Sequence, residues 1–280
     1  MAAADATLST RPARPARPGG ARIAPLGFGL LAGTYASALI LLPIAALVWE
    51  AQGMGLHGLW TTLSAAVSRS AFELTMVCSL IVVAVNAVFG TMLAWVLERD
   101  EFLGKRFVNA VIDLPFALPT IVAGLTLIAL YGQRSPIGIN IAYTRTAIVV
   151  ALAFVTLPFV VRSVQPVLRE LDREAEQAAM SLGASPFVTF RRVILPALVP
   201  AIASGCSLAF AKAVGEFGSV VLISGNIPLK TQVASVAIFG HLEPGDIKGA
   251  TALAVLLLAI SLGMLLLIGV FERVARRHES

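Results

Sequence analysis

Two ionisable side chains, Lys212 and Glu216, stand inside an otherwise apolar stretch of the chain. They are four residues apart, so they fall on one face of a helix. Charges inside a membrane segment pair with each other or line a polar cavity, because lipid does not solvate them, and they commonly mark a transport path. We therefore predict a translocation pathway here, built from Lys212, Gly215, Glu216, Phe217 and Gly218. The alternative is a neutralised pair that only fixes helix packing.

The longest polar interruption of the chain runs from Glu170 to Pro200. Apolar residues recur there at helical spacing and predict a short amphipathic helix. These residues are Leu171, Ala175, Ala178, Ala179 and Leu182. Gly183 can take the left-handed conformation that ends a helix, and Ser185-Pro186 suits the cap and first turn of a second helix. We expect that second helix to end at Arg191-Arg192, so two helices meet at a bend.

This segment resembles the cytoplasmic loop of ABC-importer permeases, whose pattern is Glu-Ala-Ala, three residues, Gly, nine residues, Ile, one residue and Leu-Pro. The matching residues are Gln177-Ala178-Ala179, Gly183, Val193 and Leu195-Pro196. Gln177 replaces the family Glu and Val193 the family Ile, although Glu174 and Glu176 keep the helix acidic. The resemblance implies an ATPase-coupling surface formed by Glu176, Gln177, Ala178, Ala179, Gly183, Ala184 and Ser185. The alternative is an amphipathic hairpin that lies on the bilayer surface.

The composition indicates a membrane protein, because 58% of the 280 residues are hydrophobic and only 13% are charged. The net charge of +5 is scattered between apolar segments, so nucleic acid is not an expected partner. Cys78 and Cys206 lie in apolar segments, and His57, His241 and His278 lack metal-ligand spacing. We find no phosphate-binding loop, so we expect no cofactor and no enzymatic activity in this chain, with ATP bound by a partner.

Six apolar stretches are long enough to cross a bilayer, which predicts an all-α, polytopic membrane protein with six transmembrane helices. They are Leu26–Val48, Leu74–Leu97, Leu114–Tyr131, Ala147–Val161, Pro196–Ile223 and Ala250–Phe271. Residues 1–25, rich in Ala, Pro and Arg, are expected to be a disordered tail rather than a cleavable signal. The transmembrane domain then covers residues 26–272, with the coupling loop at 170–195 and a C-terminal tail at 273–280.

Lys and Arg gather on alternate sides of the predicted spans. They are frequent in the N-terminal tail, the second and fourth loops and the C-terminus, and sparse in the other three loops. In this count Arg162 belongs to the fourth loop. The positive-inside rule therefore places both termini and the 170–195 loop in the cytoplasm.

Three further segments resemble the sulfate/thiosulfate permeases among ABC importers. These are Leu103–Arg106, Asp113–Thr120 and Gly215–Gly218 together with Gly225–Thr231, and the resemblance covers the chain from about Leu26 to Phe271. It implies the type I importer permease fold in a prokaryotic inner membrane. It also implies three partners besides lipid: an ATP-binding cassette ATPase dimer, a second homologous permease and an extracytoplasmic sulfate-binding protein.

Other functions remain open from the sequence. Molybdate/tungstate permeases are similar in several of the same places. An ion-coupled secondary transporter is the alternative of a different class, but inverted repeats and a denser set of intramembrane acids, which would favour it, are not found. A membrane enzyme would need a catalytic cluster, and none is found.

Overall fold

A computed structural model describes residues 26–277 of the chain. Within this range every regular element is helical, as predicted. The predicted tail of residues 1–25 and the last three residues, 278–280, lie outside the described range. The chain divides after Ala46 into two units, and each is described by itself.

The helices follow one another with short connections. In chain order they are α1 (Leu26–Gln52), α2 (Gly55–Ser64), α3 (Ala66–Arg99), α4 (Lys105–Ala117), α5 (Thr120–Tyr131), α6 (Arg145–Glu170), α7 (Arg173–Ser181), α8 (Pro186–Thr189), the π-helical η1 (Phe190–Ile194), α9 (Leu195–Val214), α10 (Gly218–Ile223), α11 (Ala234–Leu242) and α12 (Ile247–Arg277).

Five helical runs are long and apolar enough to cross a bilayer, and the bent pair of α4 and α5 makes a sixth if it counts as one span. The continuous runs are Gly29–Gln52, Ala66–Arg99, Arg145–Glu170, Pro186–Val214 and Ile247–Leu267. Each exceeds the roughly 20 residues needed to cross a 30 Å hydrocarbon layer. The predicted polytopic all-α class is confirmed.

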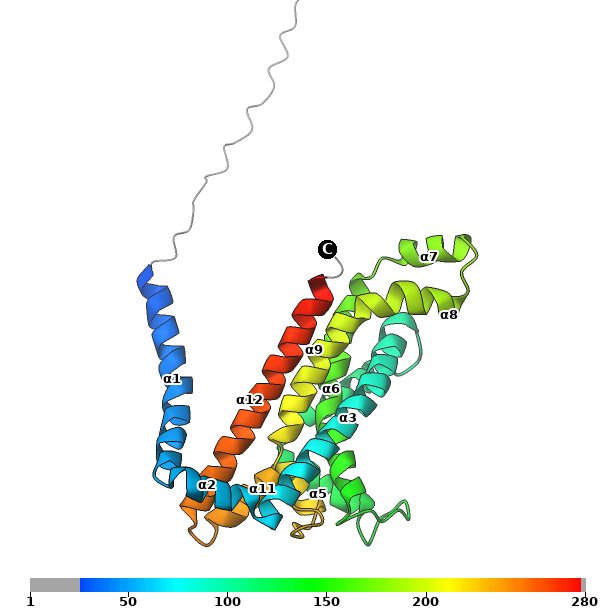
Figure 1. The fold of residues 1–280 in the computed structure, drawn as a ribbon. Helices are drawn as coiled ribbons and strands as arrows, with labels where there is room; N and C mark the ends of the chain where they lie inside the picture. Colours follow the sequence, from blue (N-terminus) through cyan, green and yellow to red (C-terminus); the bar gives the residue numbers. More distant parts are fainter. Residues whose placement is uncertain (1–25, 278–280) are drawn as a thin grey trace, which may run out of the picture. The chain divides into compact units, whose positions relative to one another are not determined.

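The core of the second unit forms where α3, α6 and α9 pack side by side (Figure 1). Glycines allow this approach: a Cβ added to Gly205 of α9 would lie 2.8 Å from the Cα of Val160 in α6. Close backbone contact of this kind drives helix association in lipid, where hydrophobic burial adds little. The buried Asn86 of α3 adds a polar link, because its amide donates to Thr156 Oγ1 of α6 at 2.9 Å.

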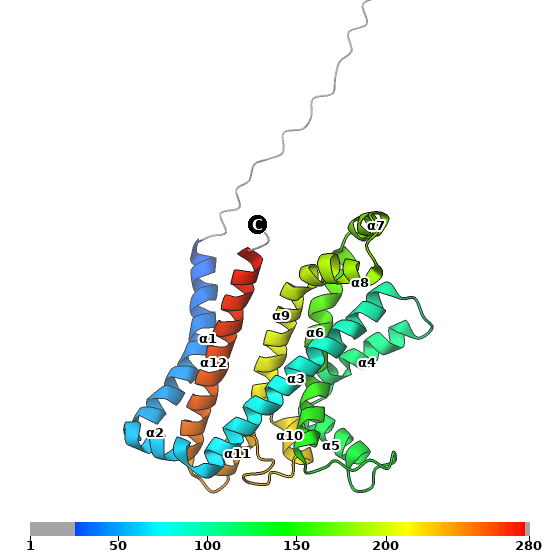
Figure 2. The ribbon, with the colours of Figure 1, turned by 45° about the vertical axis from the view of Figure 1, so that its right-hand side comes forward.

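The third predicted span, Leu114–Tyr131, is wrong as a single straight helix. The helix breaks between Ala117 and Thr120, and the axes of α4 and α5 are bent by 118° (Figure 2). Pro119 explains the break, because proline has no N–H to continue the ladder and forces an extended conformation on the residue before it. Leu118 accordingly has ψ 134°.

The fifth predicted span, Pro196–Ile223, is wrong at both ends. Helix α8 passes through η1 into α9, so the continuous run is Pro186–Val214. The second loop helix therefore does not end at Arg191-Arg192. After Val214 the helix stops, and α10 is a separate short helix that packs against α5.

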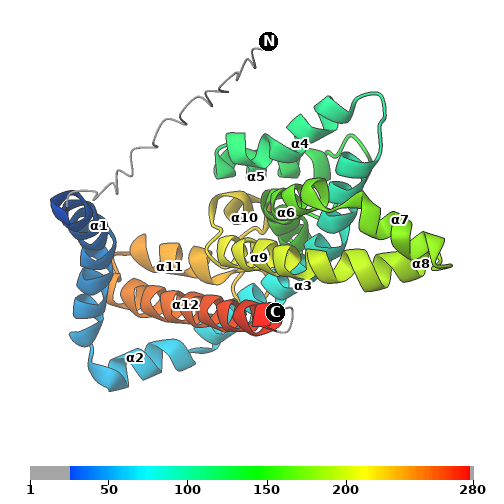
Figure 3. The ribbon, with the colours of Figure 1, turned by 90° about the horizontal axis from the view of Figure 1, so that it is seen from above.

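The fourth span is longer than predicted and continues to Glu170. Arg162, counted above as a loop residue, therefore lies inside α6. Pro158 and Pro166 lie within the helix, so neither marks its end. Viewed from above, α4 and α5 lie on one side of α6 and α12 lies on the other (Figure 3).

The second unit presents two different ends. At one end lie α7, α8 and the last turns of α12, and at the other lie α2, α5, α10 and α11 (Figures 1 and 2). These two ends carry the two sites that the sequence predicts.

Candidate coupling loop and translocation site

The loop at the α7 end begins and ends with the predicted local signals. The carboxylate of Asp172 accepts a hydrogen bond from Glu174 N at 2.8 Å and caps α7. Gly183 has φ +86°, the left-handed conformation that ends the helix without Cβ strain. Ser185 Oγ then accepts from Val188 N at 3.4 Å and caps α8, with Pro186 at the first helical position. The predicted bend is confirmed, although only the first of the two helices is short, because α8 continues through η1 into α9.

Most of the predicted coupling residues are exposed or half-buried on this loop: Gln177, Ala178, Ala179, Gly183, Ala184 and Ser185. Three large apolar side chains beside them are also exposed, namely Met180, Leu182 and Phe187. Leu182, which sequence periodicity placed in the apolar stripe of the helix, is 90% exposed. The apolar face of this hairpin is therefore not covered by the rest of the described chain.

Glu176 differs from the other predicted coupling residues because it points inward. Its carboxylate forms an ion pair with Arg99 at the end of α3, and the two side chains are only 16% and 11% exposed. The guanidinium of Arg99 also lies over the ring of Trp95, 5.4 Å from its centroid, and Trp95 meets Phe190 of η1 edge to face. Glu176 therefore holds α7 against α3, and it does not replace the acidic side chain that Gln177 lacks.

The predicted translocation pair lies at the other end of the unit. Lys212 is in the last turn of α9, and its ammonium lies 2.7 Å from Glu216 Oε2. The side chain of Glu216 is 1% exposed and that of Lys212 is 37% exposed. Glu216 follows the end of α9, so the two residues do not share one continuous helix face as predicted.

Glu216 also organises the break in the chain. Its Oε1 accepts hydrogen bonds from Ser219 N and Ser219 Oγ, each at 3.0 Å, and so caps α10. Its backbone carbonyl accepts from Ser235 Oγ of α11 at 2.6 Å. The carboxylate therefore serves an ion pair and a helix cap at once, which favours a strong structural role.

The remaining predicted pathway residues surround this break. A Cβ on Gly218 would lie 2.8 Å from Ile121 N, so glycine is needed where α10 meets α5. Phe217 packs against Phe239 of α11 with ring centroids 5.2 Å apart. Gly215 caps the end of α9, and its N–H bonds to Ala211 O at 3.4 Å. The structure therefore brings all five residues together.

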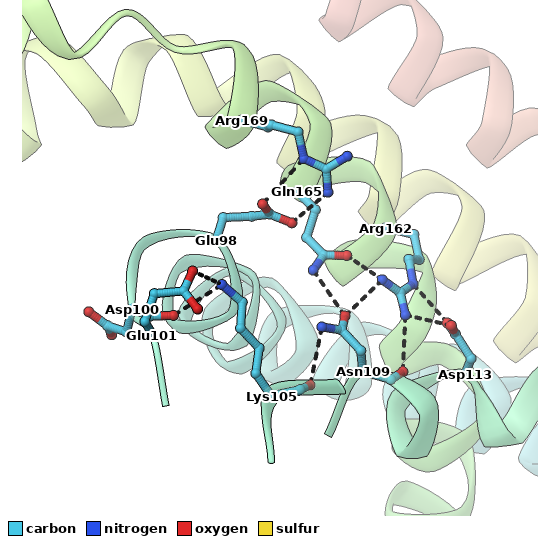
Figure 4. Close-up of polar contacts among 9 residues, drawn as sticks. All are labelled: Glu98, Asp100, Glu101, Lys105, Asn109, Asp113, Arg162, Gln165 and Arg169. Carbon is cyan, nitrogen blue, oxygen red and sulfur yellow. Dashed lines mark hydrogen bonds and ion pairs between the residues drawn. The ribbon is translucent and has the colours of Figure 1, made fainter. Parts of the chain in front are cut away.

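A polar seam between α4 and α6 was not predicted (Figure 4). Arg162 reaches Asp113 through Nε at 2.7 Å and Nη2 at 2.5 Å. Asn109 and Gln165 complete the group around the guanidinium. The available sequence signal was the spacing of Lys105, Asn109 and Asp113, which places three polar side chains on one face of α4.

No group of three His, Cys, Asp or Glu side chains that could hold a metal ion occurs among the described residues. His241 Nδ1 lies 2.7 Å from Asp246 Oδ2 in the connection between α11 and α12. Hydrogen bonds to Asp246 from Gly249 N–H and from His241 lower the pKa of that carboxyl below its usual value.

Residues 87–279 match the family described as binding-protein-dependent transport system inner membrane component. The chain belongs to this family. This family match covers the coupling loop and the α9–α10 break. The chain is therefore a permease component that crosses the inner membrane several times.

Close relatives carry a more specific description. The chain is 47% identical over 251 residues to a sulfate transport system permease protein CysT of Synechocystis sp., covering 87% of this chain and 88% of the relative. It is 42% identical over 262 residues to CysT of Salmonella typhimurium, covering 90% and 95%.

Solved structures share the fold of this permease. A bacterial alginate ABC transporter in complex with an alginate-bound periplasmic protein gives a TM-score of 0.71 at 17% identity, covering 87% of this chain and 92% of that one. The methionine ABC transporter MetNI in an inward-facing form gives 0.55 at 20% identity, covering 79% and 95%. These likenesses confirm the predicted ABC importer permease fold.

Proposed function

We propose that this permease is the membrane-spanning subunit of an ATP-driven importer of sulfate, with thiosulfate as a related cargo. The observation that carries the proposal is the high identity to two sulfate permeases over nearly their whole length. The molybdate/tungstate alternative is disfavoured because both relatives reported above are described as sulfate permeases. The ion-coupled alternative is disfavoured because the chain belongs to a family of binding-protein-dependent transport components.

The orientation in the membrane follows from charge. The α7 end of the second unit carries Arg99, Lys105, Arg106, Arg169, Arg173, Arg191 and Arg192, whereas the opposite end carries Arg69, Arg134, Arg145, Lys230 and Lys248. The positive-inside rule therefore puts the α7 end in the cytoplasm, and the Arg residues of the N-terminal and C-terminal segments of the sequence put both termini there by the same rule. Impermeant thiol labelling of cysteines introduced at Arg173 and Lys230 tests this, since only the second site should react in intact cells.

The partners follow from the exposed hairpin and the fold relatives. We assign the surface around Gly183 to contact with an ATPase dimer, because a hairpin with uncovered apolar side chains needs a protein surface to bury them. A second permease would complete the pathway, and an extracytoplasmic sulfate-binding protein would deliver the anion. ATP would bind to the ATPase, and the permease itself needs no cofactor.

The cargo assignment is tested by sulfate uptake in cells that lack this chain, before and after its restoration. We expect restored uptake that excess thiosulfate inhibits and trace molybdate does not. A chain with Gly183→Asp, produced at the same level, serves as the control for loss of coupling. If trace molybdate abolishes the restored uptake while excess thiosulfate has no effect, the sulfate assignment is wrong.

A further inference from the structure

The seam between α4 and α6 satisfies all the hydrogen-bond donors of one guanidinium, that of Arg162. Arg162 has five N–H donors, and the seam supplies an acceptor for each (Figure 4). Nε and Nη2 donate to the two oxygens of Asp113, and Nη2 also donates to Asn109 O at 3.1 Å. Nη1 donates to Asn109 Oδ1 at 3.2 Å and to Gln165 Oε1 at 2.5 Å. Asp113 therefore neutralises Arg162 through a two-point contact that fixes its orientation.

This neutral pair lies well inside the membrane layer. Arg162 is in the second half of α6, about 12 Å along the helix from Glu170 at 1.5 Å per residue. A span of this length centred in the bilayer keeps that position within the roughly 30 Å hydrocarbon layer. The side chains of Arg162 and Asp113 are nevertheless 34% and 47% exposed. Charged groups at that depth do not face lipid, so this side of the seam faces water or protein.

The chemistry of Asp113 distinguishes water from an apolar partner. Each carboxylate oxygen can accept more hydrogen bonds than the one that it receives from Arg162. The exposed neighbours of Asp113 on α4 are apolar, namely Val111, Leu114 and Phe116. Since these neighbours cannot donate hydrogen bonds, the carboxylate needs a donor from water or from a polar partner, and lipid tails cannot supply one.

We propose that the seam lines the aqueous pathway in its cytoplasmic half, where Arg162 contacts the passing oxyanion and Asp113 prevents its retention. The planar fork of the guanidinium matches the paired oxygens of a tetrahedral dianion. An anion must displace the carboxylate of Asp113 before it can bind Nε and Nη2 of Arg162, so the contact between the anion and Arg162 is brief. This role rests on the proposed transport of sulfate, whereas the position of the seam does not.

Position is tested first, without any substrate. Cys78 and Cys206 are replaced by Ala in the assembled transporter, and Asp113→Cys is then exposed to an impermeant thiol reagent in membrane vesicles open to the cytoplasmic face. Leu114→Cys is the matched control, because Leu114 is the next residue of α4 and has a similar exposed fraction of 44%. We expect labelling at position 113 at least roughly tenfold faster than at 114. Labelling at 113 only after detergent treatment overturns the proposal and indicates a seam covered by the second permease.

The anion role is tested in vesicles where wild-type sulfate uptake is measured in parallel. Asp113→Asn keeps the size of the side chain but removes its charge, so the cation of Arg162 becomes available. We expect cytoplasmic-side sulfate to inhibit transport-coupled ATP hydrolysis at about tenfold lower concentration than in wild type. The double variant Asp113→Asn/Arg162→Gln should return this sensitivity to the wild-type value, which a merely structural role would not do. Unchanged sensitivity in Asp113→Asn with normal wild-type uptake overturns the anion role, whereas absent wild-type uptake instead overturns the cargo assignment.

Discussion

The two ends of the second unit use charged side chains in different ways. At the α10 end the carboxylate of Glu216 is buried and bonded to Lys212 and to Ser219. At the α7 end one ion pair, Arg99 with Glu176, ties a hairpin whose other surfaces are exposed. The first arrangement fixes a break in a membrane helix, whereas the second leaves a surface free to bind and move with a partner. The difference predicts that changes at the α10 end affect folding, and changes at the α7 end affect coupling.

The largest effect is expected at Glu216. Replacing it with Gln leaves the charge of Lys212 without its partner and weakens the cap of α10, so we expect a loss of about 3–5 kcal/mol in stability. Thermal unfolding of the purified protein in detergent measures it. The double variant Lys212→Met/Glu216→Gln removes both charges and should recover part of the loss. A single Glu216→Gln variant as stable as the double variant would show that the ion pair contributes little.

A smaller change in stability, with a large change in function, is expected at Gly183. Asp and Asn both tolerate a positive φ better than most residues, and no atom lies within 4 Å of a Cβ added there. Gly183→Asp should therefore fold, with a loss of about 1 kcal/mol, at the low end of the cost of a non-glycine residue in the left-handed region. We expect sulfate uptake and stimulated ATP hydrolysis to fall roughly tenfold, equivalent to about 1.4 kcal/mol of lost coupling.

Gly183→Asn is the matched control, since it differs from Gly183→Asp mainly in charge. The Asn variant should retain most of the coupling if the surface around Gly183 meets a partner that disfavours a negative charge. Equal and normal transport by both variants would contradict docking at this bend.

Sequence reasoning succeeded where the signals are local. The bend at Gly183 and the caps at Asp172 and Ser185 depend on neighbouring residues, so their spacing sufficed. Lys212 and Glu216 were found because they are four residues apart. Arg162 and Asp113 are 49 residues apart and meet only because α4 packs on α6, which no local pattern encodes.

The errors have two physical origins, namely ambiguous local signals and contacts between residues that are distant in sequence. Pro119 lies in an apolar run that is long enough to cross a bilayer. Hydropathy therefore predicted one straight span and missed the 118° break between α4 and α5. The π-helical turn at Phe190–Ile194 carries two arginines, and a polar pair inside an apolar segment resembles a helix end in sequence. The inward direction of Glu176 depends on Arg99, which lies 77 residues away along the chain.

Two Arg–Glu pairs of the second unit differ in burial, Arg99 with Glu176 and Arg69 with Glu73. Arg99→Gln should release α7 and reduce stability by about 1–2 kcal/mol, between the values for exposed and buried pairs. Hydrogen exchange should accelerate in α7 while α6 and α9 stay protected. Arg69→Gln is the control, because Arg69 and Glu73 at the opposite end are 75% and 62% exposed and should contribute almost nothing. Unchanged exchange in α7 would mean that Arg99 does not hold the hairpin.

The smallest effect is expected at Asp246, in the connection between α11 and α12. The Gly249 N–H bond and the contact with His241 lower the pKa of its carboxyl, so its ionised form stabilises the folded state. This contribution is fully present above the unfolded pKa of about 3.9 and is lost as the pH falls through the depressed folded pKa.

Asp246→Asn should cost less than about 0.5 kcal/mol at pH 7, because the side chain is half exposed and Asn still accepts a cap hydrogen bond. The difference in melting temperature between Asp246→Asn and wild type should therefore shrink below about pH 4. A difference that stays constant from neutral to acidic pH would assign the effect to packing rather than to the charge of Asp246.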